Sequence, residues 1–444
     1  MSKIAVVGTG YVGLTTGAYL AHLGHEVVCA DVIPAKVERL NLGQIPIVEA
    51  GLQEMVQEGL GEGRLSFVLG AAHAVVGAEF VFLCLPTPQG EDGSADLSYV
   101  QEAATEIAPY LESGAIVINK STVPVGSVEM VADIIGRADI AVVSNPEFLR
   151  EGTAVHDCLH PDRIVIGAAD RVAAQRVAGL YATLKAPILI TDAASAETIK
   201  YASNAFLATK VSFVNAVANL CEAVGADVGQ VVEGMALDPR IGGLFLNPGP
   251  GWGGSCFPKD TRALVRIAED AGYDFMLLRG VVAANTAQQD AVTHKIERMA
   301  GGSLSGVNVG VWGLAFKAGT DDLRDSPAIA IIDRLRARGA SVRAFDPAVA
   351  GPLDGIDVVS DPYAACDGAD VLVVLTEWPL FAELDLVKVR EVMASPRIVD
   401  ARNLFNPAYA SMLGFAYEGI GRRGWIDPSE LDMLELSDTH YGRE

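Results

Sequence analysis

The chain opens with the stretch Lys3-Ile4-Ala5-Val6-Val7-Gly8-Thr9-Gly10-Tyr11-Val12-Gly13, in which an apolar run leads directly into a G-x-G-x-x-G motif. A helical pattern then continues to about Leu23, where Gly24 ends it. The next apolar run finishes at Asp31, which follows Gly13 by 18 positions. Strand, glycine turn, helix and strand in this order predict a parallel βαβ unit that binds a dinucleotide.

Each glycine of this motif has its own task. Gly8 permits the tight turn after the strand, Gly10 lets the backbone approach a pyrophosphate at the helix N-terminus, and Gly13 allows close packing of helix on strand. A carboxylate at Asp31 can accept hydrogen bonds from the ribose hydroxyls, which favours NAD over NADP. The pattern predicts NAD as the cofactor, and an α/β domain without a cofactor is the alternative.

The same pattern returns later in the chain. Strand patterns at 80–85, 116–119 and 140–144 extend the first sheet, and Gly339–Asp346 parallels Gly24–Asp31. Between the two halves, the segments at 195–235 and 260–300 are Ala-rich and helical by periodicity. The predicted fold class is therefore α/β, with two Rossmann-like doubly wound domains joined by a central helical region. We expect an N-terminal NAD-binding domain at 1–195, a central helical and dimerisation region with a cysteine loop at 196–300, a C-terminal Rossmann-like domain at 301–423 and a polar tail at 424–444.

Composition narrows the classes of partner. The 444 residues carry a net charge of -23, which argues against nucleic acid and anionic membranes as partners but not against a small anionic ligand. No apolar run reaches the length of a membrane span, and the N-terminus has no signal-peptide pattern, so we expect a cytoplasmic protein. The six cysteines are widely spaced and form no C-x-x-C pair, so neither a disulfide framework nor a metal site is indicated.

One cysteine stands apart from the others. Cys256 lies in Gly253-Gly254-Ser255-Cys256-Phe257-Pro258-Lys259-Asp260, at the end of a Gly- and Pro-rich loop over 242–259. Most lone cysteines are packing residues, but these neighbours cannot form an apolar core. Glycine-rich backbone can supply N–H groups that stabilise a thiolate or an oxyanion. A nucleophilic thiol joined to a hydride acceptor suggests that an alcohol is taken past the aldehyde to the acid.

Further polar motifs follow predicted strands or lie on the central helix. Glu147 and Glu151 come after the strand at 140–144; they would share one face if helical, and a solvated helix start is the alternative. Lys200 and Asn204 are one turn apart on the central helix. Thr122, after the strand at 116–119, is placed to bond the nicotinamide or an ordered water.

With these residues in hand, the chain resembles the nucleotide-sugar 6-dehydrogenases of the UDP-glucose/GDP-mannose dehydrogenase family, from Lys3 to about Arg402. Single motifs are weak signals, but their shared order is specific. The motifs are Gly8–Gly13, Pro86–Pro88, Lys120–Pro124, Ser144–Gly152, Lys200–Asn204, Arg240–Gly242, Gly251–Asp260 and Phe316-Lys317 with Arg324.

The resemblance implies an activity and a residue set. The activity is a twofold NAD-dependent oxidation of UDP-glucose at C6 to UDP-glucuronate, through a thiohemiacetal and a thioester on Cys256. It implies the catalytic residues Cys256, Lys200, Asp260, Asn204, Thr122 and Glu147. It implies that the cofactor is held by Gly8, Gly10, Tyr11, Val12, Gly13, Asp31, Lys36, Thr87, Thr122, Glu151 and Arg324. It implies that the substrate is held by Glu147, Phe148, Leu149, Lys200, Asn204, Arg240, Phe245, Leu246, Asn247, Gly249, Gly253, Lys317 and Arg402.

The same resemblance implies a homodimer in which Arg240 reaches the partner subunit's site. Three alternatives stay open. The chemistry could act on another nucleotide sugar, such as GDP-mannose or a UDP-N-acetylhexosamine, although the loop before Cys256 favours UDP-glucose. The chain could be a simpler dehydrogenase with an inert cysteine, or a non-catalytic protein on the same fold.

Overall fold

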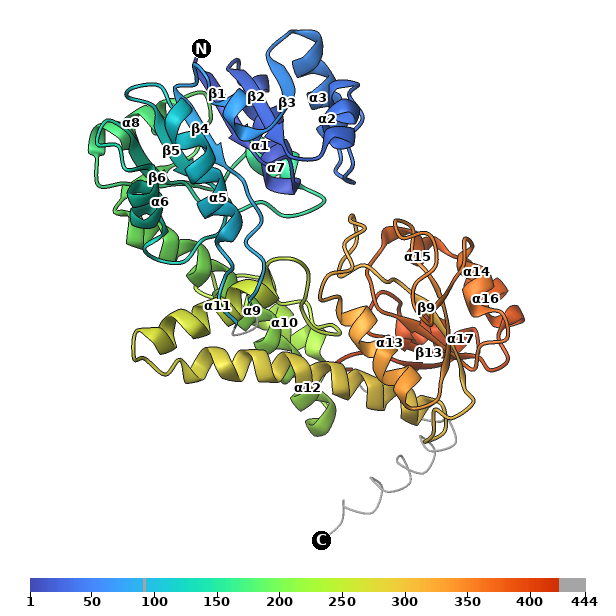
Figure 1. Cartoon of the computed structure of the whole chain (residues 1–444). Coiled ribbons are helices and arrows are strands. Elements are labelled where there is room, and N and C mark those ends of the chain that lie inside the picture. Colours follow the sequence, from blue (N-terminus) through green and yellow to red (C-terminus); the bar gives the residue numbers. More distant parts are fainter. Residues whose placement is uncertain (91–92, 423–444) are drawn as a thin grey trace, which may run out of the picture. The chain divides into compact units, whose positions relative to one another are not determined.

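The computed structural model describes residues 1–90 and 93–422, and the predicted tail at 424–444 lies outside them. The chain separates into two compact units. The first unit comprises Met1–Ala205 with Lys259–Phe275, and the second comprises Phe206–Pro258 with the chain from Met276 onward. In Figure 1 residues 1–205 run from blue to green and residues 259–275 are yellow, while the sheet of the second unit is orange and red.

The first unit is built on an eight-stranded sheet in the order β3-β2-β1-β4-β5-β6-β7-β8. All neighbouring strands are parallel except β6 and β7, which pair antiparallel at Ser144 and Gly167. The strands are β1 (Lys3–Val7), β2 (Glu26–Asp31), β3 (Leu65–Leu69), β4 (Phe80–Leu83), β5 (Ile116–Asn119), β6 (Ala141–Ser144), β7 (Ile164–Gly167) and β8 (Ile188–Thr191).

Helices connect these strands as crossovers. They are α1 (Tyr11–His22), α2 (Pro34–Asn41), α3 (Leu52–Gly61), α4 (Ala71–Ala74), α5 (Ser98–Ile107) with a 3₁₀ turn η1 (Ala108–Tyr110), α6 (Ser127–Ile135), α7 (Ala154–Leu159) and α8 (Arg171–Gly179). Strand order reverses between β1 and β4, and ligands of such sheets bind at the carboxyl ends of the strands near that point. Gly8, Asp31, Thr87, Thr122 and Glu147 all follow or end strands of this sheet.

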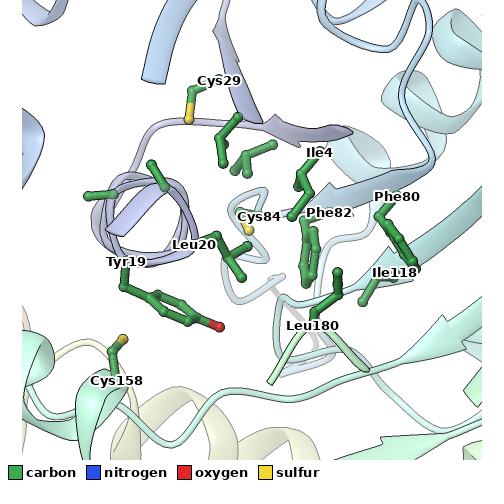
Figure 2. Packing of buried hydrophobic residues seen from close by; sticks show 14 of the residues in the cluster. Ile4, Tyr19, Leu20, Cys29, Phe80, Phe82, Cys84, Ile118, Cys158 and Leu180 are labelled. Atoms are coloured by element: carbon green, nitrogen blue, oxygen red, sulfur yellow. The ribbon is translucent and has the colours of Figure 1, made fainter. Parts of the chain in front are cut away.

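Apolar side chains on both faces of the first sheet explain its stability. The inner strands β1, β4, β5, β6 and β7 are nearly continuous runs of buried apolar residues, as expected when helices cover both faces, whereas the edge strand β8 is exposed. Figure 2 shows one of these layers, in which Tyr19 and Leu20 of α1 lie against the strand residues Ile4 and Phe82. Cys29, Cys84 and Cys158 belong to the same layer and are buried.

The second unit contains a six-stranded, fully parallel sheet in the order β11-β10-β9-β12-β13-β14. The predicted pair of doubly wound sheets is therefore confirmed. Its strands are β9 (Asn308–Trp312), β10 (Ser341–Phe345), β11 (Asp357–Val358), β12 (Val371–Val374), β13 (Arg397–Asp400) and β14 (Ala416–Glu418). Its helices are α10 (Val228–Ala236), α12 (Met276–Met299), α13 (Pro327–Ala337), α14 (Pro362–Cys366), α15 (Pro379–Glu383), α16 (Leu386–Val392) and α17 (Pro407–Met412).

Two helices of the central region contribute residues to both units: α9 (Ala193–Val224) and α11 (Phe257–Asp270). The start of α13 is capped, since the Ser326 hydroxyl accepts the Ala328 N–H and Pro327 occupies the first helical position. Among the described residues, no helix is long and apolar enough to span a membrane.

Candidate active site

The glycine turn after β1 has the shape that a dinucleotide requires. Gly8 has a φ of 94°, which favours glycine, and a Cβ at Gly13 would collide with the Gly8 carbonyl oxygen. Around Gly10, by contrast, no atom lies within 4 Å of where a Cβ would be. The N-terminus of α1 is therefore open beside Gly10, and the residues present fit a pyrophosphate at this helix end.

The carboxylate of Asp31 ends β2 beside this turn. It accepts hydrogen bonds from the Thr9 hydroxyl and from the Ile33 N–H, and it pairs with the Lys36 ammonium at 2.8 Å. Burial opposes its charge, but the bonds from Lys36 and Thr9 outweigh burial and hold the pKa of Asp31 below its ordinary value. Lys36, which was predicted to touch the cofactor, thus also fixes the acid expected to bind the ribose.

Glu147 and Lys200 form a buried ion pair. Glu147 lies in the loop after β6, Lys200 is on α9, and Nζ stands 2.9 Å from Oε1, with side chains 4% and 6% exposed for Lys200 and Glu147. The other carboxylate oxygen accepts the Leu149 N–H at 2.5 Å. Burial alone would raise the pKa of Glu147, but Lys200 and this N–H outweigh it and lower the pKa.

A second polar pair joins α9 to α11. The Asn204 amide donates to Asp260 at 2.6 Å, and both side chains are buried. The Lys259 ammonium pairs with the other oxygen of the same carboxylate at 2.6 Å. The first unit therefore brings together four of the six predicted catalytic residues as two pairs, with Lys200 and Asn204 one turn apart on α9.

The loop after β6 is not helical, although its sequence allowed a helix that would place Glu147 and Glu151 on one face. Residues 145–150 form no helix, and α7 begins only at Ala154, so Glu147 and Glu151 do not share a helical face. The loop instead lines a cavity of about 140 Å³ with Glu147, Phe148 and Leu149. Lys120 lines the same cavity, and burial lowers the pKa of its ammonium, which donates to Asn145 at 3.2 Å.

Glu49 was missed by the sequence analysis. Its buried carboxylate accepts the Tyr11 hydroxyl, the Gly152 N–H at 2.7 Å and the Ala154 N–H at 2.8 Å. Glu49 therefore connects the glycine turn to the loop that carries Glu147 and Glu151. No local motif marks Glu49, because its backbone partners are more than 100 residues away in the chain.

Thr122 lies in the turn between β5 and α6. Its carbonyl oxygen accepts the Thr87 hydroxyl at 2.9 Å, so these two predicted cofactor residues are in contact. The neighbouring Ser121 hydroxyl bonds to the backbone of Leu85 beyond β4. The turns after β4 and β5 are thereby linked at the carboxyl edge of the sheet.

In the second unit, buried amide side chains hold the glycine-rich loop before Cys256. Asn285 on α12 bonds both the N–H and the carbonyl of Trp252, at 2.8 and 2.9 Å. Asn215 accepts the Gly249 N–H, and Gln288 donates to the Gly249 carbonyl, each at 2.8 Å. The sequence analysis also missed these three amide side chains. Their place on Ala-rich helices, where few side chains are polar, was the signal that could have indicated them.

The loop leaves no room for side chains at its end. A Cβ at Gly253 would collide with the Asp325 carbonyl oxygen, and one at Gly254 would lie 2.7 Å from the Phe316 ring. Cys256 follows immediately and precedes α11, with its sulfur 3.5 Å from the Ser255 hydroxyl. Unlike the five buried cysteines, Cys256 is partly exposed.

The predicted substrate residues of the second unit gather around this loop and β13. Leu246 is buried, and the Phe245 ring packs against Phe257 with centroids 6.4 Å apart. Arg402 follows β13, donates to the carbonyls of Leu375 and Phe316, and borders Gly249.

The other cationic residues named in advance lie on loops. The Lys317 ammonium lies over the Phe316 ring, and Arg324 pairs with Asp322 at 2.6 Å. Arg240 pairs with Asp238 at 2.5 Å and its side chain is 87% exposed.

Comparisons with known proteins agree over most of the chain. Three models of the UDP-glucose/GDP-mannose dehydrogenase family match: the NAD binding domain at 2–185, the central domain at 194–287 and the UDP binding domain at 310–407. A UDP-glucose 6-dehydrogenase of Bacillus subtilis is 44% identical, covering 95% of this chain and 94% of that protein. One of Rhizobium meliloti is 45% identical over 95% of this chain and 99% of that protein.

Solved structures give the same result. A UDP-glucose dehydrogenase from Pyrobaculum islandicum superposes with a TM-score of 0.88 at 40% identity, covering 95% of this chain and 98% of that one. A UDP-D-ManNAc dehydrogenase from Pyrococcus horikoshii superposes with a TM-score of 0.85 at 30% identity, over 94% and 99% of the two chains. With domain models, sequence relatives and fold in agreement, the chain belongs to the UDP-glucose/GDP-mannose dehydrogenase family.

Proposed function

We propose that this chain catalyses the twofold, NAD-dependent oxidation of UDP-glucose at C6 to UDP-glucuronate. The observation that carries the proposal is the pair of buried contacts, Lys200 with Glu147 and Asn204 with Asp260, in a chain where Cys256 stands four residues before Asp260. An ammonium, two carboxylates and an amide withdrawn from water can stabilise and move charge at a reacting oxygen.

The proposed reaction has three stages: a first oxidation followed by thiol addition, a second oxidation, and hydrolysis. When bound, NAD supplies the hydride acceptor for each of the two oxidations. After the first oxidation has turned the alcohol into an aldehyde with loss of a proton, the Cys256 thiolate adds to the carbonyl carbon and gives a thiohemiacetal. After the second oxidation the carbon is a thioester, and water displaces the thiol to release the carboxylate. The covalent bond keeps the aldehyde from leaving between the two oxidations.

The side chains divide this work. The Lys200 charge stabilises the alkoxide or oxyanion on C6, with Asn204 as a further donor. Asp260 assists activation of the thiol or of water, and Glu147 takes up and passes on protons. Cys256 directly precedes α11, whose N-terminus favours a negative charge at that position. Thr122 contacts the nicotinamide or the attacking water.

We assign the nucleotide sugar to the loop Phe245–Gly253 and to cations of the second unit. Backbone N–H groups of the loop, together with Arg402 and Lys317, supply positive potential for the diphosphate, and Phe245 supplies a ring for the uracil. The family model that matches at 310–407 carries the description UDP binding domain, which supports this assignment. The three family matches together support a division of the chain at 1–195, 196–300 and 301–423.

A homodimer is part of the proposal. The exposed side chains of Phe206, Phe213, Leu220 and Val224 recur along one face of α9. A stripe of large apolar groups in water favours association with a second copy of the same helix. The exposed Arg240 would then reach the partner's site. Phe213→Glu should shift the protein to monomers in sedimentation velocity, and an unchanged dimer would refute this interface.

We also propose a cytoplasmic location. Widely spaced single cysteines without pairing motifs are typical of reducing compartments.

The experiment that tests the function is the amount of NADH formed per UDP-glucose consumed, with the sugar limiting. We expect two NADH per sugar and UDP-glucuronate as product. One NADH per sugar would refute the second oxidation and the role of the thiol. If GDP-mannose or a UDP-N-acetylhexosamine gave the much higher kcat/KM, the chemistry would stand and the substrate assignment would fall.

Cys256→Ser is the matching variant. It keeps the size of the side chain but removes the thiolate, so it should lose net acid formation while still binding NAD. Cys221→Ser, which changes a buried cysteine of the second unit, is the control for a general effect of removing a thiol. Full acid formation by Cys256→Ser would contradict the thioester mechanism.

A further inference from the structure

Glu197 is a buried acid for which the proposed reaction has no use. It lies on α9, one turn before Lys200, and is 2% exposed. Its two carboxylate oxygens accept the Gly126 N–H at 2.9 Å and the Val128 N–H at 3.1 Å. In the described part of the chain, no basic side chain pairs with it. A buried carboxylate whose partners are backbone N–H groups has a structural task at those groups.

The task is to cap α6. This helix begins at Ser127, and its N-cap residue is Gly126, with a φ of 95° and no side chain to accept the free N–H groups of the first turn. Glu197 supplies the missing acceptor from another helix, 71 residues away in the chain. A negative charge at this end of α6 is also favoured by the helix dipole.

The capped turn carries Thr122. The turn between β5 and α6 is fixed at its start, where Ser121 bonds the backbone of Leu85 and Thr87 bonds the Thr122 carbonyl. At its other end, the bonds to Glu197 fix Gly126. The position of Thr122 therefore depends on anchors at both ends of the turn.

We propose that Glu197 is a positioning residue, which ties the turn carrying Thr122 to the segment of α9 that carries Lys200. The inference rests on the roles proposed above for these two residues. Because one carboxylate joins the two elements, a displacement of α9 at Lys200 is transmitted to the turn that carries Thr122. A displacement of that turn is likewise transmitted to α9.

The strength of this link depends on pH. Burial raises the pKa of Glu197 to about 7, against the lowering effect of the Gly126 and Val128 N–H groups. The titratable groups facing it are the Glu129 carboxylate on α6 and the Tyr201 phenol on α9, neither of which offers a positive charge. The ionised form accepts two charge-assisted bonds, but the raised pKa means that the cost of burying the charge exceeds what these bonds return. The link therefore weakens as pH rises through about 7.

Glu197→Gln tests the proposal, because it keeps the shape but offers only one acceptor oxygen. Hydrogen exchange, followed by mass spectrometry without sugar or cofactor, should become about tenfold faster at 120–128 in the variant near pH 6. At pH 8 the wild-type acid is ionised against its raised pKa, so after correction for intrinsic exchange the difference should shrink. Asp133→Asn, which removes an exposed acid from a later turn of the same helix, is the control and should exchange as wild type.

Activity gives the second readout. Glu197→Gln should lower kcat/KM for NAD by about tenfold near pH 6 and by much less at pH 8. In a Thr122→Ala background, it should have less than a twofold further effect, because both changes act on the same contact. Multiplying losses in the double variant would overturn the proposal, and so would wild-type exchange at 120–128 in Glu197→Gln.

Exchange and activity also separate this inference from the proposed function. If exchange quickens in Glu197→Gln but Thr122→Ala turns over normally, the link between α9 and the turn stands and the assigned role of Thr122 falls. If the protein oxidises no nucleotide sugar at all, the exchange result still decides whether Glu197 holds the turn.

Discussion

The ion pair between Lys200 and Glu147 makes a quantitative prediction. Lys200→Met keeps the length of the side chain and removes its charge, which leaves a carboxylate that is 6% exposed without its closest cation. At 2.9 Å, the attraction between the two charges is about 6 kcal/mol at an effective dielectric constant of 20. Loss of one partner of such a pair usually costs about 3–5 kcal/mol.

Two groups beside the Glu147 carboxylate should keep the free-energy cost of Lys200→Met at the lower end of this range. The Leu149 N–H still donates to the Glu147 carboxylate, and the Lys120 charge still lowers the pKa of Glu147. We therefore expect a loss of about 3 kcal/mol in local stability around β6, which is roughly a 100-fold rise in opening. The loss should diminish toward low pH, where Glu147 can bind a proton instead.

The assay is hydrogen exchange of peptides covering 141–150, followed by mass spectrometry. Tryptophan fluorescence is unsuitable, because all four tryptophans lie outside 1–205 and 259–275. Lys185→Met removes an exposed lysine of the same unit and should leave the exchange rates unchanged. The double variant with Glu147→Gln should be more stable than the sum of the two single changes predicts. Additive losses, or exchange in Lys200→Met within threefold of wild type, would refute the reasoning.

Three further predictions follow from the first unit. Gly10→Ala should fold normally, because no atom lies near its Cβ, but it should raise the KM for NAD by at least about tenfold, since this Cβ would occupy the space expected for the pyrophosphate. Gly13→Ala should instead lower the melting temperature, because its Cβ meets the Gly8 carbonyl oxygen. Asp31→Ala should weaken NAD and reduce the preference over NADP, and unchanged KM values for both would mean that the ribose is held elsewhere. Because the pKa of Glu197 is raised from 4.5 to about 7 on folding, the folded state binds this proton more tightly, and its contribution to stability is lost as pH rises through 7. The melting temperature of Glu197→Gln relative to wild type should therefore rise between pH 5 and 8, and a constant difference would contradict it.

Local motifs carried enough information for the fold. The tight turn at Gly8, the helix after it and the acid at Asp31 are set by neighbours in the chain, and the parallel order of the strands follows from repeated crossovers. The residues expected to carry chemistry were found for a related reason, because side chains that follow parallel strands meet at one edge of the sheet. The loop over 145–152 marks the limit of this reasoning. It is not itself helical, because its backbone N–H groups donate to the side chains of Glu49 and Asp157.

The side chains that position the proposed catalytic residues could not be predicted from the sequence, and they share a physical reason. Glu49 and Glu197 lack a local motif, and their backbone partners are 103 and 71 residues away. Asn285 is similar, since its amide replaces the bonds that a neighbouring strand would give to Trp252. Such residues can be identified only when the fold brings their partners to them.

Glu49 and Glu197 also share a physical role at the sheet edge. Each is a buried acid that accepts two backbone N–H groups at the start of a helix, α7 in one case and α6 in the other. The loop before each helix carries a residue proposed to act in the reaction, Glu147 or Thr122. Because neither loop has regular structure of its own, a change of either acid to its amide should disturb a catalytic side chain that the acid does not touch. Activity losses at Glu49 and Glu197 would then measure how accurately this edge of the sheet must be held.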